Sequence, residues 1–341
     1  MIFKILESLE SIERRGRTSG EPKYRVFKIK DKNLLAGTVK TRIISAPNKP
    51  MLRIGRMFYG FIRLRLGRKK IKFPYATAVL PGNNPLKNVL RHLKTGNRYF
   101  YLLDIKDFYP TIRGRQIAEC LLDRTLALEL ADENELKRFL KKYCLSNSGA
   151  LRIGGPASPD LANLVAACLL DKEMAILCKK YCLTYTRYLD DLTFSGKRRF
   201  GKKKKEAIRR VIEKHDFEIS HRKTIIADTR KTTCVITGIG IKNEGQIFLK
   251  RSFLRKINGL MHLIDKGRIQ HQMNLFPLKR KSGKDPVNVV RGLMSTFWGT
   301  IPPEGRPLNA LEKKTIENYL EFSDRYRKKP ARLEKRLKMM I

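Results

Sequence analysis

The sequence predicts an α+β fold, in which a sheet flanked by helices is followed by a largely helical C-terminal region. Three observations predict it. Residues 99–105 form an apolar run with strand character, residues 182–196 alternate around an acidic tip as a β-hairpin does, and the apolar spacing is helical from about residue 250 onward. The 341 residues are enough for about two domains of ordinary size.

The N-terminal hundred residues predict a ribbon and two helices. Apolar and basic residues alternate around a polar turn over 22–47, which predicts two antiparallel strands. Helical apolar spacing follows over 51–66 and stops at a basic segment ending in Pro74. A second helix is predicted over 84–94, where a Thr-Gly-Asn turn ends it.

The central part predicts alternating strands and helices. The strand from 99 bends at Pro110, and a long helix over 160–181 precedes the hairpin. The other predicted elements are helices between 114 and 145, a loop at 154–159, a helix at 204–215, and short strands at 217–220, 223–227 and 233–241. This order of strand, helices, hairpin, helix and strand resembles the split βαβ arrangement.

The charge of the chain indicates a polyanionic partner. Lysine and arginine number 74 and aspartate and glutamate 32, so the net charge is +42. A compact body with that charge attracts a dense phosphate backbone, and the basic runs at 197–205, 279–281 and 325–338 would supply phosphate contacts. Apolar residues make up 42%, which excludes a disordered basic tail.

The cysteines and the apolar runs indicate the compartment. Six cysteines show no zinc-ligand spacing, and Cys178 and Cys182, four apart on a helical pattern, are predicted as small core residues. No apolar run reaches the roughly 18 residues of a membrane span, and charges interrupt the N-terminal apolar segment. We therefore expect a cytoplasmic protein without membrane contact.

Three aspartates stand where an acid is locally costly. Asp104 ends an apolar strand, and Asp190 and Asp191 form the tip of an apolar hairpin. Adjacent carboxylates repel each other unless a cation holds them, although an isolated Asp-Asp pair is usually a solvated turn. Together the three acids predict a site for two Mg²⁺ ions, which Mn²⁺ could replace, of the kind used in phosphoryl transfer.

The segments around these acids resemble a known family. They are Tyr188-Leu189-Asp190-Asp191, Asp104-Ile105-Lys106-Asp107-Phe108-Tyr109-Pro110, and Gly154-x-Pro156-x-Ser158-Pro159. With them the chain resembles bacterial retron-type reverse transcriptases, including defence-associated ones, over about residues 24–322. The resemblance implies a right-hand polymerase with an N-terminal region and fingers over 1–100, and a palm over 101–245 that contains the split βαβ sheet, the catalytic site and a fingers insertion at about 113–160. A mainly helical thumb with a basic tail follows over 246–341.

The resemblance also implies which residues form the site. It assigns catalysis to Asp104, Asp190, Asp191 and Lys223, and metal binding to the three aspartates and Ile105. It assigns dNTP binding to Lys40, Arg42, Ile105, Tyr109, Ile153 and Gly154, and contacts to RNA or primer to Asn88, His92, Arg251 and Arg291. In the family the aromatic ring at Tyr109 excludes a ribose 2′-hydroxyl, and the lysine at Lys223 can act as general acid.

Further segments separate the retron type from viral and intron enzymes. Asn88-Val89-Leu90-Arg91-His92, Val235-Ile236-Thr237-Gly238 and Val290-Arg291-Gly292-Leu293-Met294-Ser295 resemble boxes typical of retron enzymes. Two positions depart from the family pattern, because Ile153 replaces a glutamine and Leu189 replaces the common alanine. Neither change removes a metal ligand.

The implied function is an RNA-directed DNA polymerase. It would reverse transcribe part of a cognate structured noncoding RNA into a short DNA resembling msDNA, by two-metal nucleotidyl transfer and in anti-phage defence. Its implied partners are that RNA, the DNA product, dNTPs and a separate effector protein, and the oligomeric state stays open. Two alternatives remain: a defence-associated enzyme with an unconventional template, which Ile153 suggests, and a catalytically dead RNA-binding scaffold.

Overall fold

The computed structural model describes residues 8–17, 20–33, 38–68, 72–122, 133–243, 245–268, 285–301 and 306–326. The chain forms two compact units. The first contains residues 1–81, 101–194 and 200–225, and the second contains 82–100, 195–199 and 226–341. The predicted basic runs at 279–281 and, apart from its first two residues, at 325–338 lie outside the described residues.

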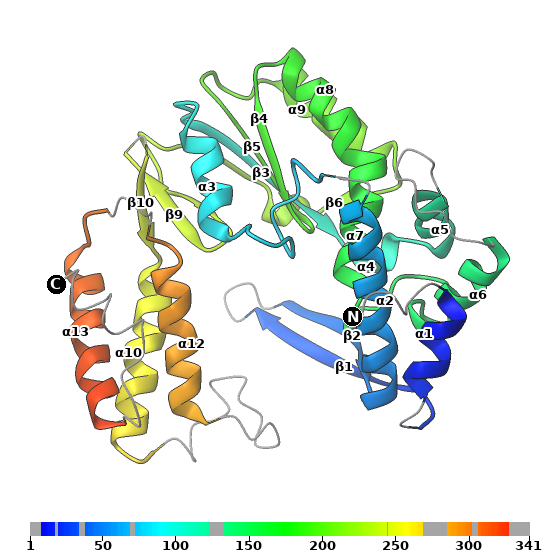
Figure 1. Ribbon diagram of the computed structural model, residues 1–341. Coiled ribbons are helices and arrows are strands. Elements are labelled where there is room, and N and C mark those ends of the chain that lie inside the picture. The colour runs from blue at the N-terminus through cyan, green and yellow to red at the C-terminus, as the bar shows by residue number, and fades with distance from the viewer. Residues whose placement is uncertain are drawn as a thin grey trace. The chain divides into compact units, whose positions relative to one another are not determined.

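The first unit begins with a helix, a ribbon and a longer helix (Figure 1): α1 (Leu9–Gly16), β1 (Tyr24–Asn33), β2 (Thr38–Pro47) and α2 (Lys49–Arg68). The two strands are antiparallel, with Tyr24 opposite Pro47 and Asn33 opposite Thr38. The predicted ribbon at 22–47 is thus confirmed. Helix α2 buries apolar side chains of the predicted helical segment 51–66, including Ile54. The helix begins two residues earlier than that segment.

A five-stranded sheet carries the hairpin. Its strands are β3 (Tyr99–Lys106), β4 (Thr184–Tyr188), β5 (Asp191–Gly196), β6 (Glu218–Ile219) and β7 (Ile225–Asp228). The order is β4-β5-β3-β6, and β7 also pairs with β3. Because β3 has neighbours on both sides and buries nearly all its side chains, its continuous apolar run is that of a central strand. The predicted hairpin is confirmed as β4 and β5.

Six described helices lie between the strands of this sheet in the chain order: α4 (Phe108–Thr111), α5 (Gly114–Leu122), α6 (Glu133–Tyr143), α7 (Ser158–Ala166), α8 (Lys172–Lys180) and α9 (Lys202–Glu213). The single helix predicted over 160–181 is wrong in one respect. A π-helical turn, η3 (Ala167–Asp171), separates α7 from α8. Cys178 is buried as predicted, but Cys182 is exposed, because α8 ends before it and the backbone turns there with a φ of 53°.

The second unit combines one helix, three short strands and three longer helices: α3 (Pro85–Leu93), β8 (Cys234–Ile236), β9 (Ile239–Lys242), β10 (Gln246–Leu249), α10 (Arg251–Asp265), α12 (Pro286–Trp298) and α13 (Ala310–Arg325). The strand predicted over 233–241 is instead two, because Thr237 and Gly238 take positive φ values of 47° and 89° and reverse the chain. The helical C-terminal pattern is confirmed. Its core includes Ile257, Phe297 and Tyr319, and Trp298 packs at its margin. Among the residues that the structure describes, no helix has both the length and the apolar character needed to cross a lipid bilayer.

Candidate active site

The hairpin turn places two of the predicted acids beside the third. Leu189 takes a left-handed φ of 57°, and with Asp190 it joins β4 to β5. The backbone N–H of Ile105 donates to the carbonyl of Asp190 at 2.9 Å. The turn is therefore fastened to β3 at the residue that follows Asp104, whose side chain is buried.

The three carboxylates act on one another electrostatically. Burial raises the pKa of Asp190, and the nearby Asp104 raises it further, while Lys223 and Arg42 lower it. Asp191 stands at the exposed start of β5, yet partial burial first, and then Asp190 and Asp104, raise its pKa to about 6. Mutual repulsion among acids held by separate strands is the situation that a bound cation relieves.

Lys223 lies next to Asp104 because the strand register brings it there. Strand β6 pairs with β3 so that Ile219 lies opposite Ile105, and the N–H of Ser220 donates to the carbonyl of Asp104 at 2.8 Å. A short 3-10 turn, η4 (His221–Lys223), follows directly. Its lysine Nζ donates to both carboxylate oxygens of Asp104, with 3.0 Å to Oδ2. The predicted catalytic lysine and the predicted metal ligand are therefore in contact.

The donor chemistry of the site fits a divalent cation. Carboxylate oxygens on rigid strands are the ligands that Mg²⁺ prefers, and here neighbouring carboxylates help to raise the pKa of Asp190 and of Asp191. In the described part of the chain, no three His, Cys, Asp or Glu side chains already converge on a single metal position. The positive charge beside Asp104 belongs to the ammonium of Lys223. The aspartates thus form an acidic site that is compensated by a lysine.

Tyr109 lies close to the same turn. Asp107 takes a positive φ of 46° and starts α4, which bends the chain three residues earlier than the predicted bend at Pro110. Burial first, and then the negative charges of Asp190 and Asp160, raise the pKa of Tyr109 to about 12. The phenol therefore stays protonated, and its half-buried ring stands near the acids.

The predicted nucleotide contacts of β2 and of the loop before α7 come together in the first unit. The N–H of Ser45 donates to the carbonyl of Ile153 at 2.8 Å. Gly154 follows with a φ of 100°, and a Cβ at that position would lie 2.6 Å from the carbonyl oxygen of Ser45. Only glycine fits so close an approach without strain. Arg42 is exposed on the same strand, and the side chain of Lys40 is outside the described structure.

Two residues predicted to contact RNA are instead interior. Asn88 and His92 are buried in α3 of the second unit. The Nδ1 atom of His92 lies 2.7 Å from the hydroxyl oxygen of Ser195, and the amide of Asn97 donates to that same oxygen at 2.8 Å. Burial lowers the pKa of His92 to about 3. Their burial does not support a direct contact of either side chain with RNA in this conformation.

The remaining predicted contacts lie on the C-terminal helices. Arg251 is exposed at the start of α10. Arg291 on α12 donates to the side-chain oxygen of Asn288 at 3.3 Å and to the carbonyl of Tyr326 at 3.4 Å. Helix α3 contacts β8 and β9, which brings the segments 88–92 and 235–238 together.

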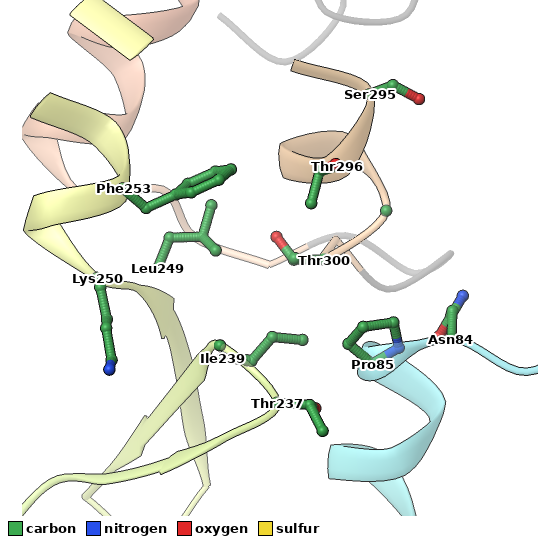
Figure 2. A pocket seen from close by; sticks show the side chains of 12 residues that line it. Asn84, Pro85, Thr237, Ile239, Leu249, Lys250, Phe253, Ser295, Thr296 and Thr300 are labelled. Atoms are coloured by element: carbon green, nitrogen blue, oxygen red, sulfur yellow. The ribbon is translucent and has the colours of Figure 1, made fainter. Parts of the chain in front are cut away.

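The second unit also has a cavity of about 470 Å³. Figure 2 shows Phe253, Leu249 and Ile239 facing the same space, with Thr296 and Thr300 on the opposite side. Among the described residues, none of those predicted for the site lines this cavity. Its lining combines apolar side chains with the polar side chains of Asn84, Thr237, Lys250, Ser295, Thr296 and Thr300.

One residue of the site region escaped the sequence analysis. The side chain of Arg187 in β4 is completely buried, and its guanidinium donates to both carboxylate oxygens of Asp171 at 2.9 and 2.8 Å. It also donates to the side-chain oxygen of Asn163 at 2.8 Å. An arginine within an apolar strand and an aspartate within an apolar helix are each costly alone, and that pairing was the available signal.

Comparisons with known proteins agree with the resemblance. No family model matches the chain. It is 30% identical over 199 residues to the Retron Ec73 reverse transcriptase of Escherichia coli, covering 56% of this chain and 63% of that protein. It is 26% identical over 313 residues to the Retron Ec83 reverse transcriptase of Escherichia coli, covering 89% and 90%. Against the Retron Mx65 reverse transcriptase of Myxococcus xanthus it is 26% identical, and the match spans 52% of that protein.

Among solved structures, a telomerase from Candida albicans in complex with the TWJ fragment of telomeric RNA has a TM-score of 0.48 and 7% identity, covering 94% of this chain and 66% of that one. The sequence matches confirm the resemblance to retron reverse transcriptases. The helices and sheets described above confirm the α+β class.

Proposed function

We propose that this chain, a relative of the retron reverse transcriptases, is an RNA-directed DNA polymerase whose active site is centred on Asp104, Asp190 and Asp191. One observation carries the proposal. The hairpin turn with two acids is hydrogen-bonded to the strand that holds the third, and a lysine contacts that third acid. Nucleotidyl transfer needs such a cluster of acids flanked by positive charge.

The side chains divide the work by position. The three aspartates would hold Mg²⁺, which when bound stabilises the charge that develops on the attacking and leaving oxygens. Arg42, which already acts on Asp190 through its charge, offers a cation to the triphosphate. Lys223 carries protons that the leaving pyrophosphate can accept. Tyr109 supplies a ring beside the acids that would restrict the sugar.

The finer part of the proposal concerns the template. The match to the Ec83 enzyme spans 89% of the chain, and the net charge of +42 suits a folded RNA held through its backbone. On this basis the template is part of a cognate structured noncoding RNA, the product is a short DNA resembling msDNA, and the setting is anti-phage defence in a bacterial cytoplasm. The fingers, palm and thumb assigned above belong to the same proposal.

One observation favours an alternative template. Ile153 stands where the family has glutamine, and it bonds to β2 through its main-chain carbonyl. An apolar side chain there offers no hydrogen bond to a nucleotide, which suits a defence enzyme with an unconventional template. A dead RNA-binding scaffold is less consistent with the site, because all three acids are present.

Primer extension on a heteropolymeric RNA template tests the proposal. Asp190→Asn should abolish dNTP incorporation and leave RNA binding nearly unchanged, because one neutralised carboxylate hardly alters a charge of +42. Asp216→Asn is the matched control, since Asp216 is exposed in a turn with a φ of 62° that asparagine tolerates. Extension by the Asp190→Asn protein at the wild-type rate would overturn the assignment. Sequencing of copurified nucleic acid separates the two template readings.

A further inference from the structure

We propose that Arg187 is a positioning residue, whose guanidinium sets the place of the Asp190-Asp191 turn by tying it to the π-helical turn at Asp171. The inference rests on the proposed function, because it assigns to that turn the role of holding catalytic acids. Arg187 itself touches neither substrate nor metal in this scheme. It lies three residues before Asp190 in the same hairpin.

Several hydrogen bonds hold the anchored end of this arrangement. Arg187 makes a two-pronged contact with Asp171, whose Oδ1 also accepts a hydrogen bond from the hydroxyl of Tyr185 at 2.8 Å. A third prong reaches the side chain of Asn163 in α7, and the amide of Asn163 donates in turn to the carbonyl of Ala78 at 3.0 Å. The π-helical turn places Asp171 at the end of η3, where it faces β4.

The other end of the arrangement is the catalytic turn. The Nη1 atom of Arg187 lies 3.5 Å from the carbonyl oxygen of Leu189, the residue with the left-handed backbone. The carbonyl of Asp190, one residue later, accepts from the N–H of Ile105 at 2.9 Å. Each of the two successive peptide carbonyls of the turn therefore has a partner, that of Leu189 in Arg187 and that of Asp190 in β3.

The main chain of Arg187 is fixed as well. Its N–H donates to the carbonyl of Tyr75 at 2.8 Å, and its carbonyl accepts from the N–H and the hydroxyl of Thr77 at 2.8 and 3.0 Å. The guanidinium thus works from a backbone that has little freedom to move. Small displacements at Asp171 would pass to the turn.

The chemistry favours positioning over simple stabilisation. A buried ion pair contributes little net stability, because the cost of removing both ions from water offsets their attraction. The planar fork of arginine does fix direction, since it can bind a carboxylate with two parallel bonds and still direct a nitrogen elsewhere. Lysine keeps the charge but cannot make these contacts together.

Two variants separate positioning from folding. Arg187→Lys keeps the buried charge opposite Asp171 but loses the fork that reaches Asn163 and Leu189. Tyr185→Phe is the matched control, because it removes a hydrogen bond to the same carboxylate and leaves the contact between Arg187 and the turn. Both proteins are compared with the wild type by melting temperature, by single-turnover dNTP incorporation on an RNA template, and by Mn²⁺ binding followed by electron paramagnetic resonance.

We expect Arg187→Lys to lower the single-turnover rate by about 100-fold, the loss that a displacement near 1 Å can cause. Its dNTP dissociation constant should stay within about twofold, because the dNTP contacts proposed here lie on other segments. Its Mn²⁺ affinity should also fall, because the two acids of the turn move relative to Asp104. Tyr185→Phe should keep the wild-type rate and Mn²⁺ affinity, whatever its melting temperature.

Equal losses in both variants, following their melting temperatures, would overturn the inference, as would wild-type rate and Mn²⁺ affinity in Arg187→Lys. The Mn²⁺ measurement separates this inference from the proposed function. If the wild type binds Mn²⁺ but does not extend primers, the proposed function fails, while a lower affinity in Arg187→Lys alone still supports positioning. Absence of Mn²⁺ binding by the wild type overturns both.

Discussion

His92 should make the fold sensitive to acid. The imidazole is buried beside Phe100 and Ser195, and burial lowers its pKa from the usual 6.5 to about 3. The folded protein therefore keeps His92 neutral, whereas the unfolded chain takes up a proton below pH 6.5. A lowered pKa of this kind gives stability that is fully present above pH 6.5 and is lost as the pH falls toward 3.

The size of the effect follows from the pKa difference. A pH of 5 lies about 1.5 units below the pKa of His92 in the unfolded chain, whereas His92 is still neutral in the folded protein. At 1.36 kcal/mol per unit, the free energy of unfolding should fall by about 2 kcal/mol between pH 8 and pH 5 through His92 alone. Carboxylates also titrate in this range. The contribution of His92 is therefore measured as the difference between the wild type and a variant that lacks this histidine.

Urea unfolding of the wild type, His92→Gln and His262→Gln at pH 8 and pH 5 measures this contribution. His92→Gln should be less stable at pH 8, but its loss on acidification should be about 2 kcal/mol smaller than that of the wild type. His262 is exposed on α10, so His262→Gln should follow the wild type. The same loss on acidification in all three proteins would show that His92 is not held neutral in the folded state.

Three further predictions concern the candidate site. Tyr109→Ala should lower the ratio of dNTP to rNTP incorporation by at least about tenfold, because the ring no longer blocks a 2′-hydroxyl; an unchanged ratio in an active variant would place the sugar selection elsewhere. The pKa of Asp191 is raised to about 6, so Mn²⁺ affinity should rise about tenfold per pH unit up to pH 6 and level off above it; a titration by electron paramagnetic resonance that shows no change between pH 5 and 7 contradicts this. Gly154→Ala should lower the free energy of unfolding by about 1–3 kcal/mol more than Gly149→Ala. Both glycines have a positive φ, but only at Gly154 would the new Cβ meet a backbone oxygen, and equal losses in urea unfolding would rule out that clash.

The strands that hold the candidate site could be predicted where a local pattern of apolar and polar residues indicates them. The alternation around Asp190-Asp191 predicted the hairpin, because an acidic tip on apolar strands has few other solutions. The apolar run before Asp104 predicted a buried strand, because a short continuous run of apolar residues is typical of a strand covered on both faces. The hydrogen bond between Ser220 and Asp104 has no local sequence signal. It could be expected only because the family resemblance assigns a catalytic role to Lys223, which follows the hairpin.

The rest depended on contacts between distant residues. His92 was predicted to contact RNA or primer, because its burial depends on a contact with Ser195, which lies far along the chain. Arg187 was overlooked because its role appears only with Asp171, and the π-helical turn that presents Asp171 leaves little trace in the apolar spacing. The turn at Thr237 was missed because an apolar run on both of its sides imitates one strand.

The interleaving of the two units has a consequence during synthesis. Helix α3 belongs to the second unit, yet it is made before most of the first, and its partners β8 and β9 follow roughly 140 residues later. At roughly 5–20 residues per second, the apolar face of α3 waits roughly 7 to 28 s for them. During synthesis this helix must therefore be shielded by other means. Slow translation, or truncation of the chain after residue 225, should expose α3 to aggregation and proteolysis before the arrangement of the acids in the first unit changes.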